Sequence, residues 1–127
     1  MKRIIETPDA PAAVGAYSQA TTDGRLVFTA GQIPLTPDGE NLREEDVSTQ
    51  TRQCLENVKA IVEDEGLTLQ DVVKTTILLA DIDDFQEMND AYGEYFADNP
   101  PARSAFAVAA LPKGARVEIE AVAAQRD

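Results

Sequence analysis

Histidine and tryptophan are absent from this 127-residue sequence, and cysteine occurs once. Without histidine the chain has no Ser-His-Asp triad, no Cys-His pair and no imidazole ligand for a metal. The single cysteine, Cys54, excludes a disulfide within the chain. Any chemistry carried by this sequence therefore uses carboxylates, arginine, lysine, tyrosine, hydroxyl groups or the backbone.

Positive charge is also scarce. Eleven basic side chains stand against 23 acidic ones, so the formal net charge is −12, and only four of the eleven are lysine. Nucleic acids and anionic membrane surfaces both attract Lys and Arg, so we expect neither as a partner. Carboxylates in large excess over lysine suit a protein kept soluble in concentrated salt, which screens their repulsion. We therefore hypothesise a halophilic source.

Long apolar runs are missing as well. No stretch approaches the ~18–20 apolar residues of a membrane span, and the N-terminus reaches an acid and Pro8 without an apolar signal segment. We expect a cytoplasmic protein. A hydrophobic fraction of 43% over this length predicts a single domain spanning residues 1–127. Cys54 stands beside Leu55 in an amphipathic run, which predicts a buried thiol acting as a small hydrophobe.

Two segments show the periodicity of amphipathic helices. The first spans residues 44–65, with Gly66 placed to cap its end, and its apolar stripe comprises Val47, Cys54, Leu55, Val58, Ile61 and Val62. The second spans residues 84–97, and Asp83 or Asp84 can cap its start. Its inward stripe comprises Phe85, Met88, Tyr92 and Phe96.

Runs of β-forming residues predict strands at residues 25–32, 72–80, 103–110 and 115–124, with residues 111–114 turning between the last two. An extra strand pair within residues 1–24 is compatible with this pattern. The order β, α, β, α, β, β predicts an α+β fold, in which two helices cover one face of a mixed sheet. The other face then lacks helical cover, and we expect it to pack against another subunit.

Alternation in the last strand puts Val117, Ile119 and Ala121 on one face, and Arg116, Glu118 and Glu120 on the other. The Cα atoms of Glu118 and Glu120 are expected about 6.5–7 Å apart. If one carboxylate is desolvated, the two pKa values differ, which suits a general base or a group that positions water. The alternative is a solvated face in an acidic protein.

Arg103 is the only basic residue between Lys74 and Lys113, and it follows the rigid Pro100-Pro101 corner. A guanidinium held in a fixed position suits bidentate capture of a carboxylate, or equally a structural ion pair. Gly31 allows close approach of a ligand to the backbone, or permits a β-bulge, and the pattern favours the bulge. Asn89 on the second helix is interpreted as solvated by default.

No spacing typical of a metal site appears. The acidic run at residues 81–84 lacks the central Gly and terminal Glu of an EF-hand loop. We interpret it as a polar loop with helix-capping carboxylates.

Several motifs, in order from Ala10 to Ala124, resemble the RidA/YjgF family of reactive imine/enamine deaminases. They are Ala10-Pro-Ala-Ala-Val-Gly-Ala-Tyr17-Ser, Thr29-Ala-Gly-Gln-Ile-Pro34, Asn57-Val-Lys-Ala-Ile-Val62, Val73-Lys-Thr-Thr76, Pro101-Ala-Arg-Ser104, Leu111-Pro-Lys113 and Val117-Glu-Ile-Glu-Ala121. The resemblance implies a chorismate-mutase-like fold and a homotrimer, with the sheets in a central barrel and active sites between subunits. It implies hydrolysis of 2-imino acids such as 2-iminobutanoate and 2-iminopropanoate to 2-oxo acids and ammonia, without a cofactor.

By position, the resemblance implies that Arg103 holds the substrate carboxylate and that Glu118 positions the attacking water. Glu120 matches a second glutamate of less defined role. The resemblance also implies that the pocket is lined by Tyr17, Gly31, Asn89 and the backbone near Ala105.

Three positions depart from common family patterns: Ala30 replaces a frequent Ser, Ala105 a frequent Cys and Ala16 a frequent Pro. The first two remove polar groups from the implied pocket and bear on substrate range. The alternative function is a non-catalytic binder of 2-oxo acids or related small carboxylates in the same cleft. An RNA-cleaving role, proposed for some family members, conflicts with the acidic charge.

Overall fold

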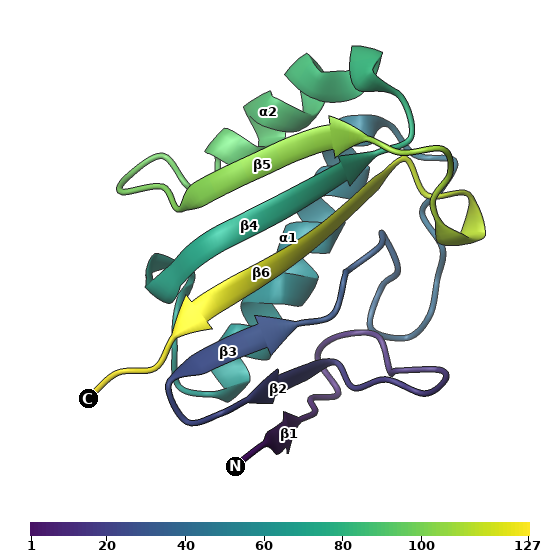
Figure 1. Ribbon diagram of the computed structural model, residues 1–127. Helices are drawn as coiled ribbons and strands as arrows, with labels where there is room; N and C mark the ends of the chain where they lie inside the picture. The colour runs from purple at the N-terminus through teal and green to yellow at the C-terminus, as the bar shows by residue number, and fades with distance from the viewer.

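Six strands form one sheet in the computed structural model, which describes residues 1–127 (Figure 1). In chain order the strands are β1 (Arg3–Ile5), β2 (Ala20–Thr22), β3 (Leu26–Thr29), β4 (Val72–Leu79), β5 (Ala102–Ala107) and β6 (Val117–Ala124). Their spatial order is β1-β2-β3-β6-β4-β5. Only β4 and β5 are parallel, and every other neighbouring pair is antiparallel.

Two α-helices, α1 (Val47–Asp64) and α2 (Phe85–Gly93), lie together behind the sheet in the view of Figure 1. Short 3-10 turns at Leu69–Asp71, Ile82–Asp84 and Pro112–Gly114 connect the larger elements. The predicted α+β class, with two helices on one face of a mixed sheet, is confirmed. Neither helix is both long and apolar enough to cross a membrane.

Helix α1 begins and ends at residues that satisfy its free backbone groups. The Asp46 carboxylate accepts a hydrogen bond from the Thr49 backbone N–H at 2.8 Å. At the other end Gly66 has φ of +77°. Its N–H donates to the Glu63 carbonyl, and the Leu67 N–H donates to the Val62 carbonyl. This is the Schellman arrangement, and it confirms the predicted Gly66 cap.

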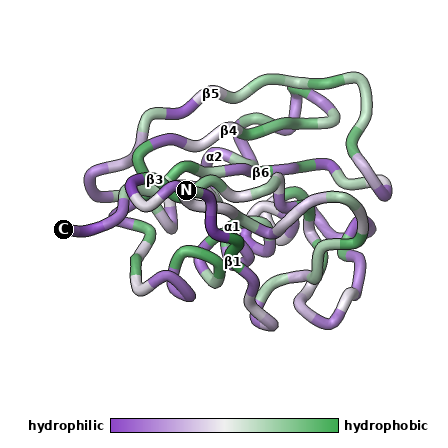
Figure 2. The backbone as a smooth tube through the Cα atoms, turned by 60° about the horizontal axis from the view of Figure 1, so that its bottom comes forward, coloured by the Kyte–Doolittle hydropathy of each residue, from purple (hydrophilic) through white to green (hydrophobic).

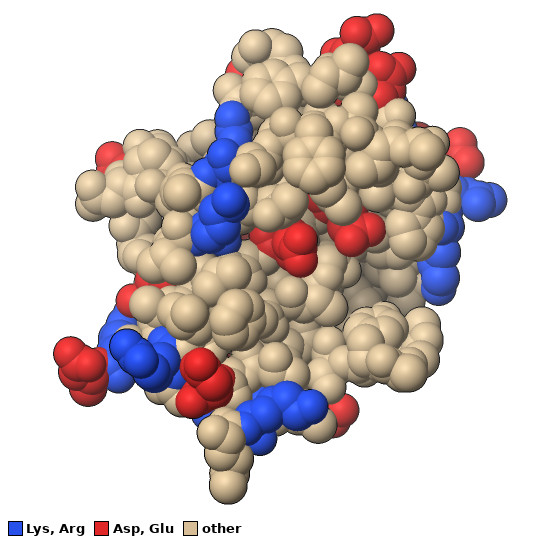
Figure 3. Space-filling model, in the orientation of Figure 1, with Lys and Arg blue, Asp and Glu red and all other residues tan.

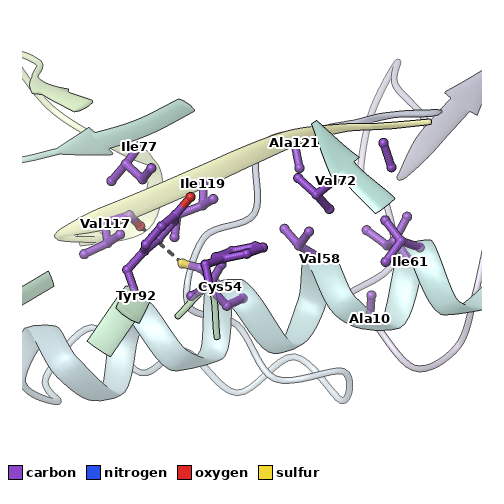
Figure 4. Close-up of a cluster of buried hydrophobic side chains, with 14 of the residues drawn as sticks. Ala10, Cys54, Val58, Ile61, Val72, Ile77, Tyr92, Val117, Ile119 and Ala121 are labelled. Atoms are coloured by element: carbon purple, nitrogen blue, oxygen red, sulfur yellow. Dashed lines mark hydrogen bonds between the residues drawn. The ribbon is translucent and has the colours of Figure 1, made fainter. Parts of the chain in front are cut away.

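The core lies between α1, α2 and the inner face of the sheet (Figure 4). The alternation predicted for β6 is confirmed, since Val117, Ile119 and Ala121 are buried and Glu118 and Glu120 are not. All six apolar positions of the predicted α1 stripe are fully buried. Cys54 is among them, and its Sγ contacts the Val117 carbonyl at 3.6 Å. The prediction of a buried, structural thiol is confirmed.

Several predicted boundaries were too wide. The first helix begins at Val47 rather than residue 44, because the cap is Asp46. The second ends at Gly93 rather than residue 97, and the following N–H groups of Glu94 and Tyr95 donate only three residues back. The strand expected over residues 103–110 ends at Ala107.

The acidic run at residues 81–84 also differs in detail from the prediction. Neither Asp83 nor Asp84 caps α2 with its side chain. Instead Asp81 accepts a hydrogen bond from the Asp83 N–H, and so caps the 3-10 turn before the helix. Asp84 forms an ion pair with Arg116, with 3.1 Å between Nη2 and Oδ1. Arg116 was predicted to share a strand face with Glu118 and Glu120, but it lies just before β6 and its guanidinium pairs with Asp84 beside α2.

The outer face of the sheet has no helix over it. Figure 3 views this face and shows uncharged surface around two central acidic groups, with basic atoms beside them and further charged groups along the lower edge. Two large apolar side chains are exposed on this face: Phe28 of β3 is 44% exposed and Phe106 of β5 is 47% exposed. Figure 2 shows the change along β5 from hydrophilic near its start to hydrophobic toward its end. The expectation of a sheet face without helical cover is therefore confirmed, while its packing against another subunit stays a prediction.

Candidate functional site

The ladder between β3 and β6 is irregular at Gly31. Phe28 pairs with Val122, but the next bridge joins Gln32 to Ile119, so three residues on one side oppose two on the other. This is a β-bulge. It also explains why the strand predicted to reach residue 32 ends at Thr29, whose hydroxyl accepts the Ala121 N–H at 3.0 Å.

The bulge brings the Gly31 backbone against the side chain of Glu118. A Cβ atom built on Gly31 would lie 2.0 Å from Glu118 Oε2, which is far shorter than the contacts that real Cβ atoms make. Gly31 therefore forms the bulge that the pattern favoured, and its missing side chain leaves room for a neighbouring group. The group that approaches is the Glu118 carboxylate of the same chain.

A cavity of about 680 Å³ opens beside this pair. Its wall includes three of the predicted site residues: Tyr17, Gly31 and Glu118. Tyr17 is 52% exposed, and its hydroxyl accepts the Val14 N–H at 3.3 Å. Ala30 also lines the wall, so the methyl group that replaces the family's frequent serine faces this space. The volume lies within the ~300–1,000 Å³ of small-molecule sites.

Glu118 has an unusual protonation equilibrium. Burial raises the pKa of its carboxyl group, and the negative charge of Glu120 raises this pKa further. The two carboxylates therefore differ in environment, because Glu120 is exposed and Glu118 is half-buried. A carboxylate with a raised pKa is a stronger base, as a group that accepts a proton from water must be.

Arg103 lies at the start of β5 with a defined orientation. Its Nη1 donates to Asn89 Oδ1 on α2 at 2.7 Å. Its guanidinium carbon lies 4.8 Å from the centre of the Tyr92 ring and 5.5 Å from that of Phe85. Contacts of this kind hold the planar group without neutralising it. Asn89 is half-buried rather than solvated, contrary to its default interpretation.

No carboxylate pairs with Arg103. The five ion pairs of the chain use Arg3, Arg43, Arg52, Arg116 and Arg126. The structural ion pair that was one alternative for Arg103 is therefore not observed. Its remaining N–H groups are available for an external anion.

Arg103 and Glu118 lie on opposite faces of the sheet. Arg103 pairs with Thr75 of β4, which is buried against the helices. Glu118 pairs with Leu78, whose other neighbour is the exposed Phe106 on the outer face. Neighbouring residues in a ladder point to the same side, so the two side chains point away from each other.

The predicted site residues thus form two groups within one chain. Tyr17, Gly31 and Glu118 meet in the cavity, whereas Arg103 and Asn89 meet beside α2. Ala105 pairs with the buried Ile77, and so belongs to the helix side with Arg103. Glu120 pairs with Thr76 on the outer face and does not line the cavity.

Sequence reasoning missed three polar residues that shape or line the cavity. Gln19 is 2% exposed, and its amide holds the backbone of residues 7–11 through Thr7, Ala10 and Pro11. Asn57 on α1 donates to the carbonyls of Ile33 and Leu35. Lys113 lines the wall in a left-handed conformation, with φ of +57°. Asn57 and Lys113 stand in the quoted motifs, but no pattern assigned any of the three to the site, because each role depends on contacts across the chain.

Known proteins resemble this chain over nearly its whole length. The model of the family described as endoribonuclease L-PSP matches residues 7–125. The chain is 48% identical to the 2-iminobutanoate/2-iminopropanoate deaminase of Salmonella typhimurium, over 99% of this chain and 100% of that protein. It is similar to the YjgF gene product of E. coli, at 46% identity and a TM-score of 0.92, over 98% and 99% of the two chains. It is also similar to E. coli TdcF with bound serine, at 44% identity and a TM-score of 0.92, over the same shares.

Proposed function

Because this chain belongs to the endoribonuclease L-PSP family, which is the RidA/YjgF family that its motifs resemble, we propose that it hydrolyses 2-imino acids to 2-oxo acids and ammonia. Substrates of this class include 2-iminobutanoate, 2-iminopropanoate and their enamine tautomers. The observation that carries the proposal is the half-buried Glu118 carboxylate facing the cavity across Gly31, with its raised pKa. The name of the Salmonella relative supports the same chemistry.

The chemistry needs no covalent nucleophile, since the carbon of a protonated imine is already electrophilic. Glu118 accepts a proton from a water molecule held about 3 Å from that carbon. The C–O bond forms, and the electrons of the C=N double bond move to nitrogen. Glu118 returns that proton to the nitrogen of the carbinolamine. The hydroxyl group then gives its proton to Glu118 as its electrons form the C=O bond, and the C–N bond breaks. The products are a 2-oxo acid and ammonia, and no cofactor takes part.

Arg103 is suited to hold the substrate carboxylate. Its ring contacts and its bond to Asn89 fix the plane of the guanidinium, and a fixed plane favours two parallel hydrogen bonds to a carboxylate. Holding the substrate by this end restricts where its imine carbon lies, which converts a random encounter with water into an oriented one.

We further propose that the complete site lies between subunits of a homotrimer. Within one chain Arg103 and Glu118 point to opposite faces of the sheet, so they reach one small substrate only if they come from different copies. The uncovered apolar face, with Phe28 and Phe106 exposed, supplies a surface for such packing. RNA cleavage is not proposed, because a net charge of −12 opposes binding of a polyanion.

Glu118→Gln and Arg103→Lys test the assignment. A coupled assay that releases 2-iminobutanoate from a dehydratase should show loss of the imine at least about 100-fold slower with either variant. The lysine variant keeps the charge but loses the fork geometry. Glu63→Gln, on an exposed part of α1, serves as the control and should match the wild type. Equal rates for all four proteins would reject the site, and binding of 2-oxobutanoate without catalysis would favour the carboxylate binder.

Mixing the two inactive variants tests the site between subunits. In randomly reassembled oligomers, about a quarter of the sites receive an intact Arg103 from one chain and an intact Glu118 from the other. Activity should therefore return to about a quarter of the wild-type value after co-refolding in equal amounts. A mixture that stays inactive, while each variant alone has the wild-type oligomeric mass, would place both residues in the same chain.

A further inference from the structure

Lys113 lines the same cavity as Glu118, and it is the only cation among the residues of that wall. It lies in the 3-10 turn before β6, between Pro112 and Gly114. The proposed chemistry uses one cation, Arg103, and leaves Lys113 without a role. A lysine beside a cavity of this size is therefore a candidate for contact with another part of the substrate.

The backbone holds Lys113 in place although its conformation is unfavourable. Its φ and ψ of 57° and 27° fall in the left-handed region, which side chains other than Asn, Asp and Gly rarely adopt. The Asn41 side chain donates to the Lys113 carbonyl at 3.0 Å, and the Ala115 N–H donates to the Pro112 carbonyl at 3.1 Å. The turn is thus fixed from both sides, and the backbone of Lys113 from which its side chain extends is fixed with it.

The charge of Lys113 is not used inside the chain. All five ion pairs use arginine, so no carboxylate lies within 4.0 Å of the Lys113 ammonium. Asp38, the second acid of the wall besides Glu118, accepts a hydrogen bond from the Thr36 hydroxyl instead. Lys113 is therefore free to bind an anion that enters the cavity.

The cavity is also larger than a short imino acid requires. 2-Iminobutanoate has seven heavy atoms, which occupy about 210 Å³ if each takes the ~30 Å³ that a water molecule has in the liquid. In a single chain, before another copy supplies its Arg103, the cavity measures about 680 Å³. A side chain longer than ethyl fits, and a terminal anion on it would meet the one cation of the wall.

We propose that Lys113 binds the distal carboxylate of dicarboxylic 2-imino acids, so that imines of the iminosuccinate and iminoglutarate class are substrates. The inference rests on the proposed function and adds a specificity-determining residue to it. Arg103 holds the carboxylate next to the imine carbon through its planar fork. Lys113 is a point charge on a flexible stem, which suits a second carboxylate whose distance varies with chain length.

Three variants isolate the charge of Lys113. Lys113→Asn removes the charge and keeps a residue that tolerates the left-handed backbone. Lys113→Arg restores the charge, and Lys59→Met removes a cation on α1 that does not line this cavity. In the assay, an amino acid oxidase generates 2-iminoglutarate from glutamate and 2-iminobutanoate from 2-aminobutyrate. Semicarbazide competes with the protein for each imine, so the decrease in semicarbazone formed measures the rate of hydrolysis.

The expected result is selective for the acidic imine. Lys113→Asn should lower kcat/KM for 2-iminoglutarate about tenfold and change that for 2-iminobutanoate less than about twofold. Lys113→Arg should recover most of the loss, and Lys59→Met should affect neither imine. Asp38→Asn, which removes a negative charge from the wall, should raise kcat/KM for the acidic imine.

Three outcomes would overturn the proposal: a wild type that hydrolyses 2-iminobutanoate alone, equal losses on both imines in Lys113→Asn, or no loss on the acidic one. If the wild type hydrolyses neither imine, the proposed function fails, and calorimetric titration then decides the role of Lys113. If Lys113→Asn binds 2-oxoglutarate more weakly but 2-oxobutanoate equally well, the role of Lys113 in binding the distal carboxylate is supported. Unchanged binding of both would reject that role.

Discussion

At the scale of single residues, the pair formed by Gly31 and Glu118 is the most informative contact. The missing side chain of Gly31 makes the space that the Glu118 carboxylate occupies. That position removes the carboxylate from water in part, and the loss of hydration raises its pKa. One backbone detail thus sets both the place and the basicity of the proposed catalytic group.

Gly31→Ala should therefore abolish activity through Glu118. The added Cβ would displace the carboxylate, and we expect kcat to fall about 100-fold or more, as when a general base is lost. Gly93→Ala is the control, because nothing lies within 4 Å of a Cβ there. Imine hydrolysis and thermal unfolding should be measured together. A fully active Gly31→Ala protein would show that the carboxylate need not occupy this position.

The pH dependence of activity should report the raised pKa of Glu118. Glu118 is active as a carboxylate, so kcat should fall as the pH drops through its pKa, above the ordinary glutamate range. Glu120→Gln removes the neighbouring negative charge that raises this pKa, and should move the acid limb to lower pH. A profile that does not move with Glu120→Gln would contradict the assignment of this limb to Glu118.

The same shift has a consequence for stability. A carboxyl group whose pKa is higher in the folded than in the unfolded state stabilises the fold below its unfolded pKa. That contribution is lost as the pH rises through the folded pKa. At neutral pH the ionised Glu118 therefore opposes folding, and Glu118→Gln should raise Tm while it removes activity. Scanning calorimetry at neutral and acidic pH should show a smaller difference between the two proteins at low pH.

At the scale of elements, the periodic patterns predicted which segments are helices and strands, and the ends depended on capping. Helix α1 ends at the Gly66 Schellman motif, which the sequence signalled. Helix α2 ends four residues earlier than its apolar pattern indicated, since Phe96 is buried from a turn rather than from the helix. Apolar periodicity reports which side chains face the core, and it does not report where the hydrogen bonds of the helix stop.

Gly66→Ala tests the C-terminal cap of α1. The residue has φ of +77°, and a side chain in this conformation should cost about 1 kcal/mol of unfolding free energy. Gly93→Ala, inside α2 and without positive φ, should instead be neutral or stabilising by about 0.5–1 kcal/mol. Urea unfolding curves measure both. Equal stability of the two variants would mean that the cap does not require glycine.

At the scale of the whole molecule, the charges and the apolar surface are separated. Seventeen of the 23 acids lie between Asp38 and Asp98, in the segment that contains both helices. The outer face of the sheet shows uncharged surface around two central acidic groups (Figure 3). Most of the excess negative charge therefore belongs to the segment that contains the helices. It does not oppose packing of subunits through the sheet, or binding of a small carboxylate in a cavity.

Salt should stabilise this protein if its acidity is an adaptation to concentrated salt. Eleven basic groups cannot neutralise 23 acids, so repulsion among the carboxylates opposes the folded state until counterions screen it. We expect Tm to rise steadily between low and molar KCl. Potassium glutamate and sucrose controls separate screening from general solute effects, and a Tm independent of KCl would reject the halophilic hypothesis.

The fold class, the buried face of β6 and the residue types available for chemistry could all be predicted from the sequence alone. These follow from local periodicity and from composition, including the absence of histidine. Only the tertiary structure decided where the candidate residues meet. Contacts across the chain produce the bulge at Gly31, the ring contacts of Arg103 and the placement of Lys113 in the cavity wall. One such contact is the hydrogen bond between Thr29 and Ala121, which are 92 positions apart. Strand register determines which side chains share a face, and register depends on pairing between distant segments rather than on the pattern within one.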